Sequence, residues 1–119
     1  MKLIIASSGP RPADRVDPRF GRAPYLVQYD SADESFTALD NSAQAALAQG
    51  AGVQAAQTVV GLGAEAVLTG RCGPKAFHIL AESGVTVYAG CTGTVQDAVE
   101  AWHDGRLEAL TAANARAHH

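Results

Sequence analysis

The sequence predicts a single α/β domain built on a mixed, five-stranded sheet. Two short β-branched runs, 66–69 and 85–88, each lead into a Gly-rich turn and then into a helical pattern. Such βα units favour parallel strands joined by right-handed crossovers. Two earlier runs, 25–30 and 35–39, are separated by the polar tetrapeptide 31–34, which is typical of an antiparallel hairpin. A chain of 119 residues with 47% hydrophobic content is large enough for one core and too small for two.

The chain begins with a strand and a long connection. The apolar run Leu3–Ala6 predicts a first, buried strand. Residues 7–24 form a loop, because the prolines at positions 10, 12, 18 and 24 exclude a helix there. A loop of this length is uncommon in a small domain and is often functional. Residues 40–49 are polar and Ala-rich, and we expect a linker that leads into a helix.

Three helices are predicted after this linker, and each carries a start or stop signal. The first spans residues 52–60 and ends at a pair of glycines. The second begins at Pro74, which is tolerated in a first helical turn. The third begins at the Thr-x-x-Asp capping pattern of residues 94–97. Helical spacing predicts three buried faces: Val53, Ala56 and Val60; Ala76, Phe77, Leu80 and Ala81; and Val95, Val99 and Trp102.

Residues 50–55 have the Gly-x-Gly-x-x-Ala spacing of a dinucleotide-binding turn. That motif needs a strand directly before it and an acidic residue about 20 positions later. A polar linker precedes it here, which favours a plain helix start made of small residues. After the last helix, residues 106–110 are expected to add a short edge segment. We therefore expect one domain over residues 1–110 and a flexible tail over residues 111–119.

Composition excludes several classes of function. The formal net charge of −3 argues against general nucleic-acid binding, which requires an excess of Lys and Arg. No run approaches 18 continuous apolar residues, so we expect no membrane span. Two cysteines in a chain of this size do not make a disulfide framework. A cytoplasmic protein with reduced thiols is the resulting expectation.

Positive charge is concentrated in two predicted loops. Six of the nine Lys and Arg residues lie there, namely Arg11, Arg15, Arg19, Arg22, Arg71 and Lys75. Guanidinium groups keep their charge and offer several donors, so this pattern predicts an anion site. The helix that begins at Pro74 would point its positive end to the same place. The alternative is a solvated, variable connection with no ligand.

The two cysteines occupy matched turns, each directly after a predicted parallel strand. If the strands are neighbours, Cys72 and Cys91 both emerge at the carboxyl edge of the sheet, where open α/β sheets bind ligands. Three interpretations are open: inert small residues in turns, a disulfide or redox pair, or soft contact with a metal–sulfur species. A lone zinc ion or a standard iron–sulfur cluster requires about four ligands, which two cysteines do not supply.

Three separated segments resemble the nitrogenase iron–molybdenum cofactor biosynthesis and carrier family. They are Val16-Asp17-Pro18-Arg19-Phe20-Gly21-Arg22-Ala23-Pro24-Tyr25, Leu68-Thr69-Gly70-Arg71-Cys72-Gly73-Pro74-Lys75-Ala76-Phe77 and Gly93-Thr94-Val95-Gln96-Asp97-Ala98. The resemblance implies a ribonuclease-H-like, three-layer fold with strand order 3-2-1-4-5 and helices on both faces. The size of this chain and its two cysteines are most similar to members that bind an anionic molybdenum–copper–sulfide cluster. The resemblance therefore implies non-covalent binding of such a cluster here.

The residues and the resemblance together predict a carrier without catalysis of its own. Arg15, Arg19, Arg22, Arg71 and Lys75 would supply charge, Phe20 would shield the cluster from water, and Cys72 and Cys91 would contact metal. One rival is an enzyme for phosphorylated small molecules, with His78 or Asp17 as base. Another is a metal-free interaction module for a partner in metal handling or cell division.

Overall fold

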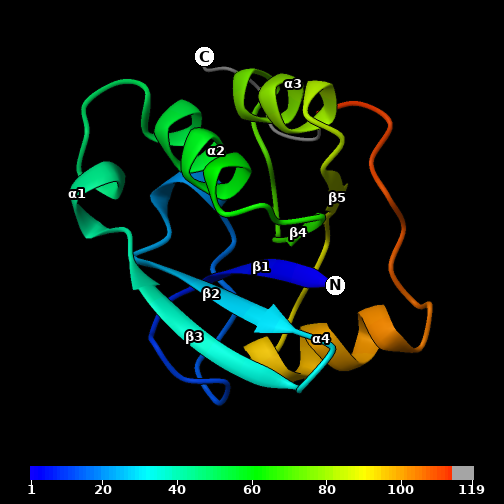
Figure 1. Cartoon of the computed structure of the whole chain (residues 1–119). Coiled ribbons are helices and arrows are strands. Elements are labelled where there is room, and N and C mark those ends of the chain that lie inside the picture. The colour runs from blue at the N-terminus through cyan, green and yellow to red at the C-terminus, as the bar shows by residue number, and fades with distance from the viewer. Residues whose placement is uncertain (114–119) are drawn as a thin grey trace.

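The computed structural model describes residues 1–113 and confirms the predicted mixed sheet (Figure 1). The part of the predicted tail from residue 114 onward lies outside the described residues. The five strands are β1 (Lys2–Ser7), β2 (Tyr25–Asp30), β3 (Ser35–Asp40), β4 (Ala66–Leu68) and β5 (Thr86–Tyr88). Their order in the sheet is β3-β2-β1-β4-β5, which is the order that the resemblance implied. β1 pairs antiparallel with β2 and parallel with β4.

Helices cover both faces of this sheet. The helical elements are the 3-10 turn η1 (Phe20–Arg22) and the α-helices α1 (Ser42–Ala45), α2 (Ala51–Gly61), α3 (Pro74–Glu82) and α4 (Val95–His103). Figure 1 shows α2 and α3 side by side on one face and α4 on the other. The predicted capping pattern of α4 is a true capping box, with reciprocal bonds between Thr94 and Asp97. Within the described residues, no helix is long and apolar enough to cross a membrane.

The core is divided by the sheet into two clusters. Along β1, Ile4 and Ala6 pack under α2 and α3, whereas Leu3 and Ile5 pack against the α4 face. All four side chains are fully buried. Successive residues of a strand point to opposite faces, so a strand that is apolar at every position requires a covering layer on each side. The three-layer arrangement therefore follows from the apolar run at the N-terminus.

Two predicted helix faces are wrong in part. In α2, Val60 is 36% exposed and Val59 is buried instead, next to Ala55 and Ala56. In α3, Ala81 is exposed. An Ala-rich helix gives little contrast between its faces, so the spacing alone does not decide which face is inward. Alanines face inward in α2 because this helix lies close to its neighbours.

The predicted edge segment after α4 is confirmed. Ala109 forms an antiparallel bridge with Tyr88 of β5, and the N–H of Leu110 donates to the carbonyl of Val87 at 2.8 Å. This segment covers the outer side of β5. The hairpin between β2 and β3 is confirmed as well, with Glu34 in a left-handed conformation at φ 58°.

η1 lies directly on the first turn of α2. A Cβ atom placed on Gly21 would come within 2.5 Å of Gly52 Cα and 2.6 Å of its nitrogen, so only glycine fits here. The contact is between two backbones, which cannot move apart without moving η1 or α2. This close approach brings the end of the long connection to the start of α2.

We expect Gly21→Ala to lower the free energy of unfolding by about 1–3 kcal/mol, the usual cost of overpacking. Gly61→Ala is the matched control, because a Cβ atom there meets nothing within 4 Å and no left-handed φ is required. Urea unfolding monitored by circular dichroism would measure both variants. Equal midpoints for Gly21→Ala and the unmodified protein would contradict the assigned contact.

Candidate functional site

Residues 8–19, here called the strap, cross the carboxyl end of the sheet, where β1, β4 and β5 end. The strap is fastened by backbone hydrogen bonds to the turn between β5 and α4. The N–H of Val16 donates to the carbonyl of Gly93 at 2.9 Å, and the N–H of Val95 donates to the carbonyl of Asp14 at 2.8 Å. The long connection is therefore ordered by pairing with distant segments, which local sequence signals do not reveal.

The strap and η1 are also fastened to the turn between β4 and α3. The N–H of Phe20 donates to the carbonyl of Arg71 at 3.1 Å, next to a parallel bridge between Arg19 and Arg71. Gly70 lies so close to Pro18 that a Cβ atom on it would meet the proline backbone at 2.8 Å. The strap, the turn after β4 and the turn after β5 therefore meet at one end of the sheet.

A hollow of about 520 Å³ opens beside this junction, between η1, the start of α2 and the start of α3. We call it the α2–α3 hollow. Phe20, Arg22, Gly50, Val53, Gly73 and Lys75 are among the residues that line it. Phe20, Arg22 and Lys75 were predicted as site residues from the sequence, and the structure places all three at this hollow.

Two helices begin at the α2–α3 hollow without a capping side chain. The N-cap residues are Gly50 for α2 and Gly73 for α3, and neither supplies a side-chain hydrogen bond to the first turn. The first N–H groups of a helix lack partners within the helix, and the helix dipole makes this end positive. Two such ends beside one cavity favour a negatively charged occupant.

The other predicted cations surround the same end of the sheet at different positions. Arg19 and Arg71 are brought next to each other by their bridge. Arg15 lies on the far side of the strap, bridged to Thr94. Within residues 1–113, the ion pairs are formed by other cations, so none of these five predicted cations is paired with a carboxylate. Unpaired like charges at one edge create the positive potential that attracts an anion.

Arg22 has a structural task that the sequence did not reveal. One of its guanidinium nitrogens, Nη1, donates to the carbonyls of Ala45 at 2.8 Å and Leu47 at 2.6 Å. These carbonyls belong to the end of α1 and the residues just after it. Arg22 thus holds the α1–α2 linker at the rim of the hollow, and the rest of its guanidinium has donors left for a ligand.

The two thiols lie in different layers of the protein. Cys72 is fully buried in the core cluster beneath α2 and α3, and Cys91 is 7% exposed in the cluster beneath α4. Their side chains belong to different core clusters, because the chain leaves β4 toward α3 on one face of the sheet and leaves β5 toward α4 on the other. Burial raises the pKa of each thiol to about 11, so both are protonated at neutral pH.

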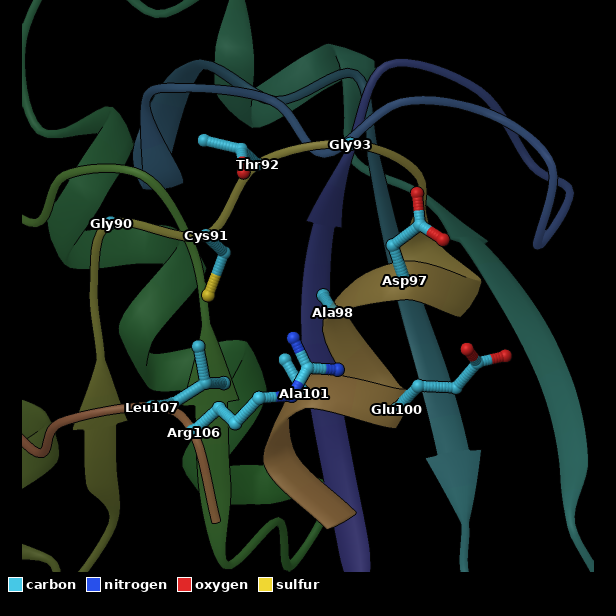
Figure 2. A pocket seen from close by; sticks show the side chains of 10 residues that line it. All are labelled: Gly90, Cys91, Thr92, Gly93, Asp97, Ala98, Glu100, Ala101, Arg106 and Leu107. Carbon is cyan, nitrogen blue, oxygen red and sulfur yellow. The ribbon is translucent and has the colours of Figure 1, made fainter. Parts of the chain in front are cut away.

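Cys91 points its sulfur into a second hollow of about 340 Å³, next to Ala98, Arg106 and Leu107 (Figure 2). The opposite wall carries the carboxylate of Asp97. The charges in this hollow are mixed, unlike those around the α2–α3 hollow. Among the described residues, no group of three or more His, Cys, Asp or Glu side chains is placed to hold a metal ion.

The capping box of α4 connects charge at this end of the sheet to stability. The N–H of Thr94 donates to Asp97 Oδ2 at 3.0 Å, and the N–H of Asp97 donates to Thr94 Oγ1 at 3.0 Å. These bonds lower the pKa of Asp97 below its ordinary value of 3.8, and the charges of Arg15 and Arg106 add to the effect. The ionised carboxylate is therefore the form that the fold favours.

We expect Asp97→Asn to reduce stability at neutral pH and to become equivalent to the unmodified protein in acid. A lowered pKa stabilises the fold above the unfolded value of 3.8, and this contribution is lost as pH falls through the folded pKa. Urea unfolding from about pH 7 down to about pH 2 would show the gap between the two proteins closing below about pH 4. Thr94→Val should cost about 1 kcal/mol at neutral pH and lose part of this cost in acid, because the Thr94 hydroxyl is one of the groups that lower the pKa of Asp97. A gap that stays constant in acid would contradict the assignment.

Sequence reasoning found one of the two helix ends at the site and missed the other. The positive end of the helix that begins at Pro74 was predicted to face an anion, whereas the start of α2 at Gly50 was taken as packing alone. The available signal was a helix start with Gly, rather than Ser, Thr, Asp or Asn, at both N-cap positions. Such a start leaves N–H groups available to a ligand.

The sequence profile of the dinitrogenase iron-molybdenum cofactor family matches residues 1–105, so the chain belongs to this family. Among solved structures, the chain is similar to the apo form of the orange protein from Desulfovibrio gigas. The two are 37% identical, with a TM-score of 0.92 and 96% of each chain covered.

Two further proteins are similar to most of this chain. An NMR structure from Thermotoga, described as that of a NifB protein of the DUF35 family, is 35% identical with a TM-score of 0.84; the match covers 96% of this chain and 97% of that one. An uncharacterised protein of Methanocaldococcus jannaschii is 24% identical over 98 residues, which are 80% of this chain and 82% of that protein. The fold and the family agree with the sequence prediction.

Proposed function

We propose that this protein is a carrier that binds an anionic molybdenum–copper–sulfide cluster without covalent attachment and without catalysis of its own. The cluster is its cargo, and the α2–α3 hollow is the binding site. The observation that supports this most strongly is the meeting of two uncapped helix starts with Lys75 and Arg22 at one cavity. The family assignment and the similarity to the orange protein agree with a cluster as ligand.

The chemistry of the hollow suits a thiometallate anion. Its charge is matched by Lys75, by the free donors of Arg22 and by Arg71 and Arg19 nearby, while the helix N–H groups can approach its sulfide atoms. Phe20 is 2% exposed and closes the inner wall with carbon, which excludes water and strengthens the electrostatic attraction. Arg15 lies farther along the strap and contributes through the long-range field.

The thiols have a secondary part in this proposal. Cys72 directly precedes Gly73 at the hollow, and Cys91 lines the neighbouring one, but burial keeps both in the thiol form. Ligation of metal by either sulfur requires loss of its proton and a local opening of the loops. We therefore propose that charge and backbone donors hold the cluster, and that Cys72 and Cys91 can bind copper only after such an opening.

Lys75→Gln is expected to weaken cluster retention by about threefold to tenfold at low salt, because it removes one charge-assisted contact. The measurement is an anaerobic titration of apo-protein with tetrathiomolybdate and copper(I), followed by desalting, visible absorption and metal analysis. Retention should also fall in about 1 M salt, where the Debye length is about 3 Å. Arg22 is a poorer test position because its loss would also free the α1–α2 linker.

Lys2→Gln is the matched control, since Lys2 lies at the other end of β1 and the same unit of charge is removed. If both variants weakened cluster retention equally, the cluster would be held by the overall charge of the protein and not by the α2–α3 hollow. Complete loss of metal and colour from the unmodified protein on desalting would contradict it. Turnover of a phosphoester by the metal-free protein would instead support an enzyme at the same edge.

Separate Cys72→Ala and Cys91→Ala variants are expected to keep most of the bound molybdenum, because the cluster is held mainly by charge and backbone donors. Metal analysis of the desalted proteins gives the molybdenum and copper content of each. Thermal unfolding of the apo-variants must be measured beside it, since removing a buried sulfur leaves a cavity. Loss of both metals from a variant that is still folded would show that the thiolate is an essential ligand.

A further inference from the structure

A groove of about 570 Å³ lies between the β2–β3 hairpin and α4, where β1 begins and thus away from the strap. We call it the hairpin groove. Its walls include Tyr29, Glu34, Val99, Glu100, His103 and Asp104. The α2–α3 hollow shares no residue with this groove.

Tyr29 forms the floor of the hairpin groove and carries an unused polar group. The residue is only 8% exposed, and its ring packs against Phe36 with the centroids 4.9 Å apart. Within residues 1–113, its hydroxyl forms no hydrogen bond. The hydroxyl oxygen itself is open to solvent in the groove, so it is available to donate to or accept from a ligand.

Two carboxylates of the groove are free of cations. Among the described residues, neither Glu34 nor Glu100 forms an ion pair, and Glu100 only accepts a bond from Gln96 Nε2 at 3.0 Å. Asp104 is paired with Arg106 at 3.3 Å. Burial, followed by the charges of Glu34, Asp30 and Asp33, raises the pKa of Tyr29, as expected in a negative field.

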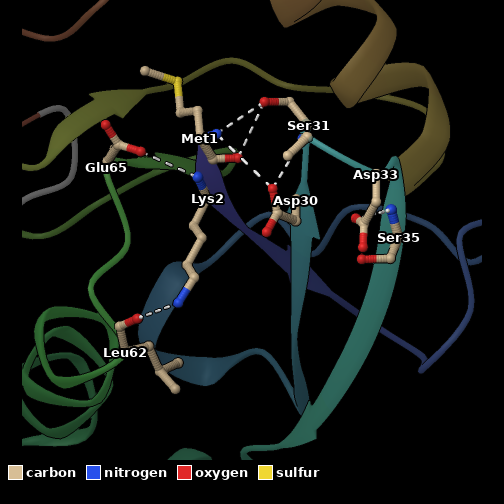
Figure 3. A network of polar contacts seen from close by, with 9 residues as sticks. Met1, Lys2, Asp30, Ser31, Asp33, Ser35, Leu62 and Glu65 are labelled. Carbon is tan, nitrogen blue, oxygen red and sulfur yellow. Dashed lines mark hydrogen bonds and ion pairs between the residues drawn. The ribbon is translucent and has the colours of Figure 1, made fainter.

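The nearby positive groups are already occupied. The amine of Met1 donates to Ser31 Oγ at 3.1 Å and lies 3.9 Å from Asp30 Oδ1 (Figure 3). Lys2 Nζ reaches toward the carbonyl of Leu62 at 3.5 Å, on the side of α2 (Figure 3). Hence Glu34 and Glu100 face the groove without a neutralising cation, while His103 is the titratable group beside them.

We propose that the hairpin groove is a docking site for an arginine side chain presented by a partner protein. A guanidinium group has five N–H donors in one plane, enough to reach Glu34, Glu100 and the hydroxyl of Tyr29 together. Its flat face and methylene stem suit the apolar wall at Val99. A metal ion is disfavoured because no described cluster of three or more ligating side chains exists here.

The groove is independent of the cluster site. Because the two lie at opposite ends of the sheet, a partner could dock here while the cargo remains accessible. The occupant is therefore a second protein that recognises the carrier without covering its cargo. Failure of the cluster proposal would leave this docking site unaffected, since no residue is shared between them.

The test uses the peptide acetyl-Gly-Ser-Arg-Ser-Gly-amide and the same peptide with citrulline in place of arginine. Citrulline keeps the shape of the side chain and lacks the charge. A chemical-shift titration of ¹⁵N-labelled full chain should show shifts confined to residues near Tyr29, Glu34, Val99 and Glu100. The citrulline peptide should bind at least about tenfold more weakly.

Variants locate the site. Glu34→Gln with Glu100→Gln should weaken binding of the arginine peptide by about tenfold or more, whereas Glu82→Gln with Glu108→Gln removes the same charge elsewhere and should leave binding unchanged. Tyr29→Phe should weaken it about threefold without loss of stability, since the hydroxyl has no partner within the described fold. Cluster loading of these variants should stay normal.

Three results would overturn the proposal. If the citrulline peptide bound as tightly as the arginine peptide, the groove would not recognise the charge of the side chain. If the control pair weakened binding as much as Glu34→Gln with Glu100→Gln, the peptide would be attracted by net charge alone. Absence of groove shifts, together with salt-sensitive self-association in sedimentation that Arg11→Gln abolishes, would identify the occupant as a second copy of this chain.

Discussion

The structure depends on one constraint, which is the complete burial of β1 on both faces. Its backbone groups must be satisfied on each side, and β2 and β4 do this with opposite directions of pairing. Its side chains must be covered above and below, and this requires α2 and α3 on one face and α4 on the other. Since β4 and β5 both run parallel to β1, α3 and α4 begin at one end of the sheet. The location of the proposed binding edge is thus a consequence of how the core is covered.

At that edge, the backbone carries more of the chemistry than the side chains do. The contact of Gly21 with Gly52 brings η1 onto α2, so the start of α2 joins the start of α3 at one cavity. Arg22 and Lys75 line this cavity, and neither forms an ion pair among the described residues, whereas Cys72 is buried in the core and Cys91 faces the neighbouring hollow. The cavity is therefore suited to an anion that is held by charge and N–H groups, and released again without breaking covalent bonds. Such binding is appropriate for a carrier.

Much of the fold could be predicted because its signals are local: apolar runs, a polar hairpin, Pro74 at a helix start and the Thr94 capping box. The strap could not be predicted, since pairs such as Val16 with Gly93 join segments far apart in the chain. The sequence also could not predict on which face of the sheet Cys72 and Cys91 would lie. Within the described residues, only a short bridge at Ala109 follows α4, and the composition of a turn is the same whichever face of the sheet the chain moves to. The bonds of Arg22 to the carbonyls of Ala45 and Leu47 could not be predicted either, because they depend on where α1 lies.

The strand order also shapes how the chain must fold during synthesis. β1 leaves the ribosome first, and β2 and β3 can pair beside it as soon as residue 40 is made. The other side of β1 waits for β4, because Leu3 and Ile5 pair with Ala66 and Leu68. At about 5–20 residues per second, this interval lasts a few seconds. Throughout that time the most apolar strand of the protein presents a bare edge, the feature through which nascent chains aggregate or recruit chaperones.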